Sequence, residues 1–400
     1  MPHRPTHYIT DAADLADFSR RLQHHDRIAF DTEFVGEETF IPRLELIQVA
    51  GYEESAVIDV PALAERGALD SLWDVFNNPA IEKIFHAGRQ DLELIAIHTG
   101  QIPAPFFDTQ IAAAMVGYGA QVAYAGLVQR LTGKRLAKSH TFTNWSQRPL
   151  TKDQINYALE DVQYLLPIYD RLCARLQSLG RMDWVREEFS RMRATVGDKA
   201  REPQDRYQRI RGWENLSPRV AAVLRELAAW REGEAKRRNV PRGRVLRDEV
   251  VLQVARQAPK KLDELRAIRG MHPSEVERNG DVILAIIRHA SALPPSEWPD
   301  IPRGRKPEPE AAGQVELLQA VLKARALEQD IAPSLLAGTS DLQTLVDAKH
   351  DRQALDLPIL RGWRRTLAGE VLLRVLNGET AVSIDPRSGK ILLTSGSSAL

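Results

Sequence analysis

Two acids, Asp31 and Glu33, are the first side chains in the chain whose type and spacing point to chemistry. They lie in residues 27–34 (RIAFDTEF), an apolar, β-prone run that predicts a strand. Residues at positions i and i+2 of a strand point to the same side, so both carboxylates would face one way. Like charges repel, and a divalent cation such as Mg²⁺ or Mn²⁺ is the simplest counter-charge because hard cations bind carboxylate oxygens. On its own, a D-x-E pattern is more often a solvated strand end.

Two later motifs supply the other groups of a metal site. In residues 85–91 (FHAGRQD), Asp91 falls in the first turn of a predicted helix that follows a predicted strand, although an acid there also complements the helix dipole. Tyr157 and Asp161 are spaced as i and i+4 on a predicted helix and therefore share one face. Four carboxylates and a phenol are the parts of a two-metal site, in which two divalent ions about 4 Å apart bind an attacking water and a phosphodiester.

Together the three motifs resemble those of the tyrosine-type subgroup of the DEDD 3′-to-5′ exonucleases. They are Asp31-x-Glu33, His86-Ala87-x-x-x-Asp91 and Tyr157-x-x-x-Asp161. Residues 138–150, which contain NW and RPL before the third motif, are similar to ribonuclease D in particular. Helical segments farther along resemble the helicase and ribonuclease D C-terminal (HRDC) domain.

The resemblance implies an α/β exonuclease domain, ribonuclease H-like with a mixed sheet and flanking helices, followed by two small all-α HRDC-like domains. It implies an enzyme that removes nucleotides singly from RNA 3′ ends, such as those of tRNA precursors and other small RNAs. The products would be nucleoside 5′-monophosphates, and the cofactors two divalent ions, Mg²⁺ or Mn²⁺.

The resemblance also assigns roles to individual residues. The metal ligands would be Asp31, Glu33, Asp91 and Asp161, and Tyr157 would position the nucleophilic water. Further candidates for contact with the terminal nucleotides are Phe34, His86, Gln90, Lys138, Trp145 and Arg148. Of these, Trp145 fits a core position equally well, and His86 fits a residue that orients its strand end better than a metal ligand.

The elements that position these residues are short. Strands are predicted near 28–34, 40–50, 55–60 and 81–85, and close succession of strands suggests an antiparallel meander. Helices are predicted at 69–77 and 90–98, so this part of the chain is α/β with a mixed sheet. A capping box of Thr151 and Gln154 predicts a long helix over 152–179. Asp108 precedes another helix and is interpreted as its N-cap.

The domain organisation follows from a change in the predicted secondary structure after Gly197, where helices separated by proline and glycine replace strands. The second helical set repeats the plan of the first, which indicates an internal repeat of about 70 to 80 residues. We expect an exonuclease domain at 1–200, HRDC-like domains at 212–292 and 313–380, a proline-rich linker at 293–312 and a tail at 381–400 that contains a hairpin.

The charge balance gives no global field toward nucleic acid, since 54 basic residues face 54 acidic ones. Residues 231–247 are locally basic, a pattern that is most often a solvated helix face. Within that stretch the resemblance makes Arg237, Arg238, Arg242 and Arg244 the candidates for phosphate contacts. The single cysteine, Cys173, excludes an intramolecular disulfide and a cysteine-based zinc site.

No apolar run approaches the roughly 20 residues that span a bilayer, and the N-terminal residues lack the apolar core of a signal peptide. A cytoplasmic monomer without membrane contact is therefore expected. Two other functions stay open. The first is a DNA 3′-to-5′ exonuclease with the same chemistry, which would lack the paired helical repeats. The second is a non-catalytic nucleic-acid-binding scaffold, in which clustered acids without metal would be costly.

Overall fold

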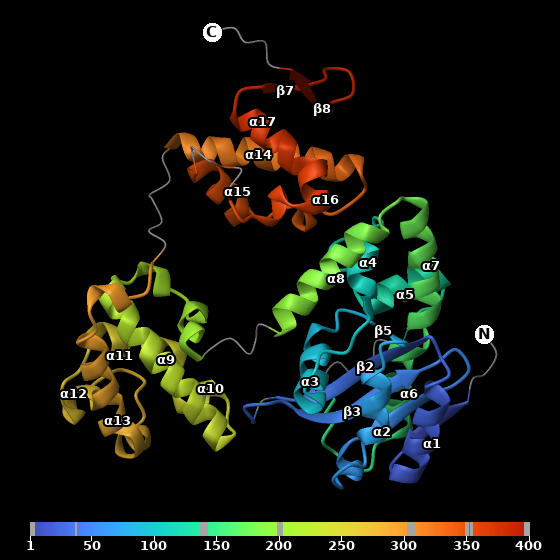
Figure 1. Ribbon diagram of the computed structural model, residues 1–400, viewed down its shortest axis with the longest axis horizontal. Helices are drawn as coiled ribbons and strands as arrows, with labels where there is room; N and C mark the ends of the chain where they lie inside the picture. The colour runs from blue at the N-terminus through green and yellow to red at the C-terminus, as the bar shows by residue number, and fades with distance from the viewer. Residues whose placement is uncertain are drawn as a thin grey trace. The chain divides into compact units, whose positions relative to one another are not determined.

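The structure is a computed structural model that describes residues 5–36, 38–136, 143–197, 203–301, 309–348, 352 and 355–395. By its internal contacts the chain divides into two compact units. The first unit comprises Met1–Glu33, Glu45–Gly197 and Pro307–Leu400, and the second comprises Phe34–Leu44 and Asp198–Lys306. The predicted succession of an α/β part and a helical part is confirmed (Figure 1).

A six-stranded sheet forms the centre of the α/β part. In spatial order its strands are β1 (Thr6–Ile9), β4 (Ser55–Asp59), β3 (Arg43–Ala50), β2 (Arg27–Val35), β5 (Glu82–Phe85) and β6 (Phe106–Asp108). Strands β3 and β4 are antiparallel, whereas β1 with β4, β2 with β5 and β5 with β6 are parallel. The predicted mixed sheet is thus confirmed. Strands β1 and β6 were not predicted, because runs of 4 and 3 residues carry too little alternation to be recognised.

The helices of this part are α1 (Ala12–Leu22), α2 (Asp70–Asn77), α3 (Arg89–Thr99), α4 (Thr109–Ala114), α5 (Tyr124–Thr132), α6 (Lys152–Gln163), α7 (Leu165–Ser178) and α8 (Met182–Gly197), with a 3₁₀ turn at Pro61–Leu63. Some of these helices, such as α1, α4 and α6, begin at a capping side chain, and α3 and α5 end at a glycine. The predicted capping box of Thr151 and Gln154 is present at the start of α6. Gly133 ends α5 in the left-handed conformation that favours glycine, with φ 79°.

Strand β2 alternates its side chains between the two faces of the sheet. On one face, the ring of Phe30 lies 5.0 Å from that of Phe76 in α2. On the other face, Ala29 belongs to the buried apolar cluster that includes Leu165 and Leu172 of α7. Odd-numbered residues of β2 therefore point toward the α7 side of the sheet, and even-numbered residues point toward the α2 side.

The prediction of one helix over 152–179 is wrong, because the segment forms two helices that meet at Tyr164. Pro167 lies in the first turn of α7, where it lacks the N–H that a continuous helix would bond to the carbonyl of Gln163. The apolar pattern did not reveal the break, since Leu165 and Leu166 continue it without interruption.

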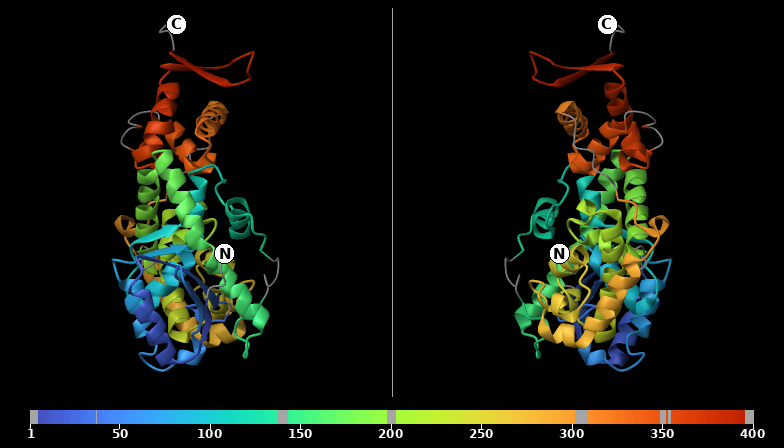
Figure 2. Two further views of the ribbon diagram at one scale, coloured as in Figure 1. Left: turned by 90° about the vertical axis from the view of Figure 1, so that its right-hand side faces the viewer. Right: turned by 90° about the vertical axis from the view of Figure 1, so that its left-hand side faces the viewer.

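The C-terminal part of the first unit is helical and ends in a hairpin. Its elements are α14 (Pro309–Glu328), η6 (Pro333–Leu335), α15 (Thr339–Asp347), η8 (Pro358–Leu360), α16 (Gly362–Arg364), a π-helical turn (Arg365–Gly369), α17 (Glu370–Leu376), β7 (Thr380–Ile384) and β8 (Ile391–Ser395). Strands β7 and β8 pair antiparallel, which confirms the predicted hairpin, and Figure 2 shows them as a ribbon continuing from α17. Residues 302–308 of the predicted linker lie outside the described residues, and α14 begins within its expected range.

This helical part shares its core with the α/β part of the same unit. Trp184 of α8 stacks on Trp363 of α16, with ring centroids 4.8 Å apart and planes 12° from parallel. Beside the stack, Glu188 accepts two hydrogen bonds from the Arg364 guanidinium. Because one apolar cluster contains buried residues of α4, α7, α14 and α17, these helices stabilise one another.

The second unit is a helical bundle with its own core. Its helices are η3 (Pro203–Arg209), η4 (Trp213–Asn215), α9 (Pro218–Arg238), α10 (Arg242–Val245), α11 (Asp248–Gln257), α12 (Leu262–Arg266), α13 (Pro273–Ser291) and η5 (Pro295–Glu297). Ser217 caps α9, with Pro218 at the first helical position.

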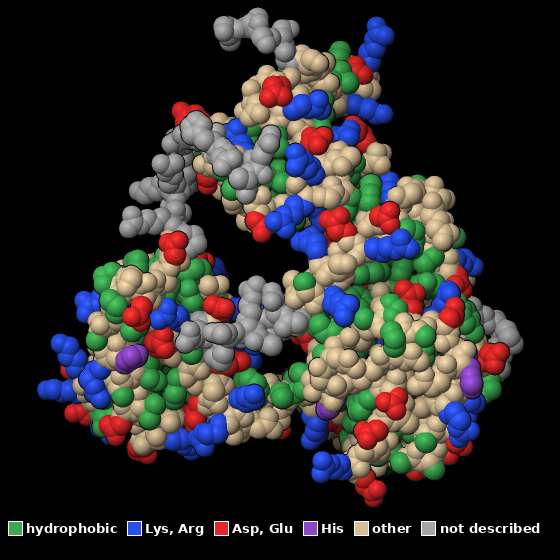
Figure 3. Space-filling model, viewed as in Figure 1, with side chains coloured by type: hydrophobic (Ala, Val, Ile, Leu, Met, Phe, Trp, Pro, Cys, Tyr) green, Lys and Arg blue, Asp and Glu red, His purple; other side chains and the backbone are tan. Residues whose placement is uncertain are grey.

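On the surface of the protein, acidic and basic side chains are interspersed over the visible face, in keeping with the neutral formal charge (Figure 3). Among the described helices, none is both long and apolar enough to cross a membrane.

Arg181 is expected to contribute strongly to the stability of the first unit. Its buried guanidinium donates to the carbonyls of Met115 and Gln329, each at 2.7 Å. Arg181→Ala leaves these carbonyls without that donor and should lower the free energy of unfolding by about 2 to 3 kcal/mol, measured by urea denaturation with tryptophan fluorescence. The control is Arg186→Ala, whose ion pair with Asp183 is exposed and should matter by less than about 0.5 kcal/mol. Equal losses in the two variants would contradict this assignment.

Candidate active site

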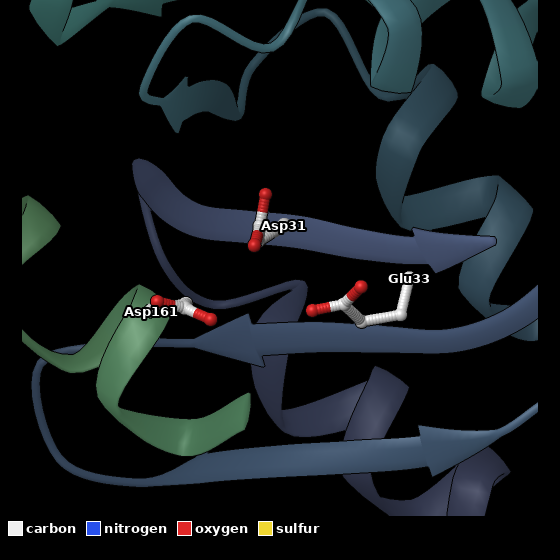
Figure 4. A group of neighbouring side chains, drawn as sticks. All are labelled: Asp31, Glu33 and Asp161. Atoms are coloured by element: carbon white, nitrogen blue, oxygen red, sulfur yellow. The ribbon is translucent and has the colours of Figure 1, made fainter. Parts of the chain in front are cut away.

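Three carboxylates converge at the sheet. Asp31 and Glu33 on β2 and Asp161 on α6 each present one oxygen, and these oxygens lie within 4.8 Å of one another. Figure 4 shows the three side chains directed into a common space between the strand and the helix. The period of two in β2 puts both strand acids on one face, and the last turn of α6 brings Asp161 to them. All three are half-buried.

The pKa values of all three acids lie above their ordinary values. Burial, together with the charges of Asp161 and Asp91, raises the pKa of Glu33 to about 8. Burial raises the pKa of Asp161 to about 7. The pKa of Asp31 lies well above its ordinary value, because of burial first and then the neighbouring negative charges. Carboxylate oxygens held this close fit a hard divalent cation, whose charge would favour the ionised form of each acid.

Asp91 lies beside this group of three but is not part of it. Its buried carboxylate, in the first turn of α3, accepts a hydrogen bond from the hydroxyl of Thr32. Thr32 stands between the two strand acids in sequence and is buried on the opposite face of β2. Since the charge of Asp91 contributes to the raised pKa values of Asp31 and Glu33, all four predicted acids act on one another. Thr32 could not be found from the sequence, because the D-x-E pattern leaves this position unspecified.

The turn between β5 and α3, just before Asp91, has a strained backbone and is held by a hydrogen bond. Ala87 adopts a left-handed conformation with φ 55°, and its N–H donates to the carboxylate of Asp108 at 3.0 Å. Asp108 also caps α4, as predicted. The next residue, Gly88, approaches the strand closely, and a Cβ at this position would lie 2.6 Å from Cδ2 of Phe85. A buried acid and a glycine therefore fix where α3 starts.

Tyr157 lies one turn before Asp161 on α6. Burial raises its pKa to about 12, and the charges of Asp161 and Glu33 add to the shift. The phenol is therefore protonated at neutral pH and can both donate and accept a hydrogen bond. A second tyrosine, Tyr124 on α5, was missed because no spacing relates it to the motifs. Its hydroxyl donates to the carbonyl of Glu160 at 3.0 Å.

His86 lies at the strand end with both ring nitrogens engaged. Nδ1 is 2.9 Å from Oγ1 of Thr109, and Nε2 is 2.9 Å from the carbonyl oxygen of Val122. Burial lowers the pKa of His86 to about 4, so the ring is neutral at physiological pH. These contacts match the interpretation of His86 as a residue that orients its strand end.

The other predicted substrate residues fall in different surroundings. Phe34 follows Glu33 on β2 and is half-buried, and Gln90 is exposed on α3. Trp145 is 7% exposed and packs in an apolar cluster, and Arg148 is hydrogen-bonded within the chain. Lys138 lies outside the described residues.

The basic set in the second unit is largely paired with acids of that unit. Its ion pairs are Arg237 with Glu234 at 2.7 Å, Arg238 with Glu275 at 3.0 Å and Arg242 with Glu232. Arg244 is exposed, and within the described part of the chain it has no such pair. Most of the positive charge predicted for this stretch is therefore neutralised locally.

Comparisons with known proteins agree with this geometry. A family model described as 3′-5′ exonuclease matches residues 6–177, and a model of the HRDC domain matches residues 220–287. The protein named ribonuclease D in Granulibacter bethesdensis is 38% identical over 396 residues, which cover 96% of each chain. Its namesake in Nitrobacter hamburgensis is 40% identical over 384 residues, covering 94% of this chain and 97% of that protein.

A solved structure extends the similarity to three dimensions. The crystal structure of Escherichia coli RNase D, described as an exoribonuclease involved in structured RNA processing, matches with a TM-score of 0.82 at 30% sequence identity. The match covers 92% of this chain and 98% of that one. Near-complete coverage in sequence and structure, with acids converging on one face of β2, shows that this chain belongs to the ribonuclease D family.

Proposed function

We propose that this 3′-to-5′ exoribonuclease is of the tyrosine type and releases nucleoside 5′-monophosphates with two divalent ions, Mg²⁺ or Mn²⁺. The convergence of Asp31, Glu33 and Asp161 within 4.8 Å carries the proposal. Asp91 beside them completes a set of four acids with oxygen donors only, the chemistry that hard cations prefer.

In this mechanism the four acids would hold the ions, and Tyr157 would hold the water. When bound, the ions would activate the water and stabilise the entering and leaving oxygens of an in-line displacement. The protonated phenol of Tyr157 orients the water through its hydroxyl, one helical turn from Asp161. Thr32 keeps the carboxylate of Asp91 directed at β2.

The proposed substrates are RNA 3′ ends, including those of tRNA precursors and other small RNAs. The similarity to an exoribonuclease involved in structured RNA processing supports this choice over DNA. Phe34, Gln90, Trp145 and Lys138 remain candidates for contact with the terminal nucleotides. We further propose that the enzyme works as a cytoplasmic monomer.

We also propose that residues 313–380 form a second HRDC-like domain after the one expected at 212–292, with the exonuclease domain at 1–200. The order of elements supports a repeat. A helix of 21 residues, α9, is matched by one of 20 residues, α14, and each is followed by a short turn, a helix, a second short turn and a closing helical segment. Phosphate contacts from these domains would position RNA without reading its sequence.

The activity is tested on a 5′-labelled single-stranded RNA with a free 3′-hydroxyl. We expect a ladder that shortens by one nucleotide at a time with Mg²⁺ or Mn²⁺ and no shortening in EDTA. Asp161→Asn should lower the rate by at least about 100-fold, because it removes a charged metal ligand. A DNA of the same sequence tests the 2′-hydroxyl requirement, and equal rates on both substrates would favour the DNA exonuclease alternative.

A pH-dependent effect of metal on stability follows from the raised pKa values. Without metal, the folded protein binds more protons than the unfolded chain between about pH 4 and pH 8, so these acids make stability fall as pH rises through that window. A divalent ion replaces those protons and should stabilise the folded protein more at pH 8 than at pH 5.5. At 100 times its Kd the stabilisation is about 2.7 kcal/mol.

The measurement is thermal unfolding of metal-stripped protein at both pH values, with and without Mn²⁺. Asp31→Asn is the control, because it removes a ligand and part of the repulsion. An equal shift of Tm by Mn²⁺ in the variant and the wild type would show that the ion binds elsewhere.

A further inference from the structure

Every donor of the Arg148 guanidinium is used inside the protein. Nε donates to Oδ2 of Asp59 at 2.6 Å, and Nη2 donates to Oδ1 of Asp59 at 3.0 Å and to the carbonyl of Glu45 at 3.4 Å. Nη1 donates to the carbonyls of Trp145 at 2.6 Å and Gln147 at 3.0 Å. A guanidinium has five N–H groups, so none is left for a phosphate of RNA.

The partner of Arg148 is a fixed anion in the sheet. Asp59 ends β4 and is only 2% exposed. Its carboxylate also accepts hydrogen bonds from the hydroxyl of Tyr8 on β1 and from the N–H of Ala62 at 3.2 Å. Burial alone would raise the pKa of Asp59, but the bonds from Arg148 and Tyr8 hold it below its ordinary value. The ionised pair of Arg148 and Asp59 therefore connects the segment before α6 to strands β4 and β1.

The pair of Arg148 and Asp59 holds Trp145 in place, and Trp145 in turn packs beside Tyr157. The carbonyl of Trp145 accepts from Arg148, while its ring packs in a cluster with Leu46 of β3 and Ala158 of α6. The same ring lies 6.1 Å from the ring of Tyr157, with planes 30° apart. Arg148 also comes three residues before Thr151, the cap of α6.

We propose that Arg148 is a positioning residue for hydrolysis, which holds Trp145 against Tyr157 so that the phenol keeps the orientation needed to meet the attacking water. This inference rests on the proposed function of Tyr157. Only arginine provides the planar fork that bonds Asp59 with two nitrogens and reaches three carbonyls as well. The role differs from the substrate contact expected from the sequence, because Arg148 acts on RNA through two other side chains.

The test measures kcat and KM separately on single-stranded RNA with Mn²⁺. Arg148→Lys keeps the charge but loses the fork, and should lower kcat about tenfold with KM changed less than about twofold. In a Tyr157→Phe background the same change should lower kcat by less than about twofold, because the hydroxyl that Arg148 positions is absent. Guanidinium added to Arg148→Ala should restore part of the lost kcat.

Arg21→Lys is the matched control, since Arg21 also forms a two-nitrogen pair, with Glu54 at 2.7 and 2.9 Å, in a place not connected to Tyr157. It should leave kcat within about twofold. Where Arg148→Lys does not fold, as judged by circular dichroism, Asp59→Asn takes its place with the same expected pattern.

The possible results separate the inference from the function it rests on. A raised KM with unchanged kcat, or an equal loss of kcat in the wild-type and Tyr157→Phe backgrounds, would overturn the positioning role while leaving the exonuclease intact. A wild-type protein that shortens no RNA would overturn the proposed function itself, and Tyr157→Phe with full kcat would overturn the role of Tyr157.

Discussion

Repulsion among carboxylates is the constraint on which the rest of this structure depends. Asp31, Glu33 and Asp161 are gathered within 4.8 Å, and Asp91 adds its charge from the start of α3. Burial disfavours the charged form of all four acids and raises their pKa values, and at Asp31 and Glu33 the neighbouring negative charges add to the shift. A protein that keeps such a group must hold it by other interactions, and the surrounding contacts do so.

Those contacts are mostly buried polar bonds to the backbone or the sheet. Asp108 accepts the N–H of Ala87 and so holds the strained turn before Asp91. Thr32 bonds Asp91 from the face of β2 opposite to the strand acids. Tyr124 bonds the carbonyl next to Asp161. Each bond joins two separate parts of the chain, at least one of which carries or directly precedes a functional residue, and this limits the motion of the site.

The helical parts differ in how they are built. Helices α14 to α17 share an apolar core with α4, α7 and α8, and so belong to the same compact unit as the acids. In the second unit, glutamates pair with most of the arginines that the sequence suggested for phosphate contact. A run of basic residues in a sequence therefore does not by itself predict an exposed positive surface, because the packing of the helices decides which of these residues form ion pairs.

The sequence by itself determined which of the candidate side chains share a face of a strand or helix. Spacing of two on a strand puts Asp31 and Glu33 on one face, spacing of four on a helix puts Tyr157 above Asp161, and a capping box starts that helix. These relations depend on neighbours along the chain, so periodicity is enough to find them.

Only the tertiary structure decided the rest. The bond between Thr32 and Asp91 and the pairing of Arg148 with Asp59 could not be predicted from the pattern. Arg148 is 89 residues from Asp59 and 103 from Glu45 in sequence. Contacts between residues this far apart leave no periodic trace, because they depend on how strands and helices pack after each has formed.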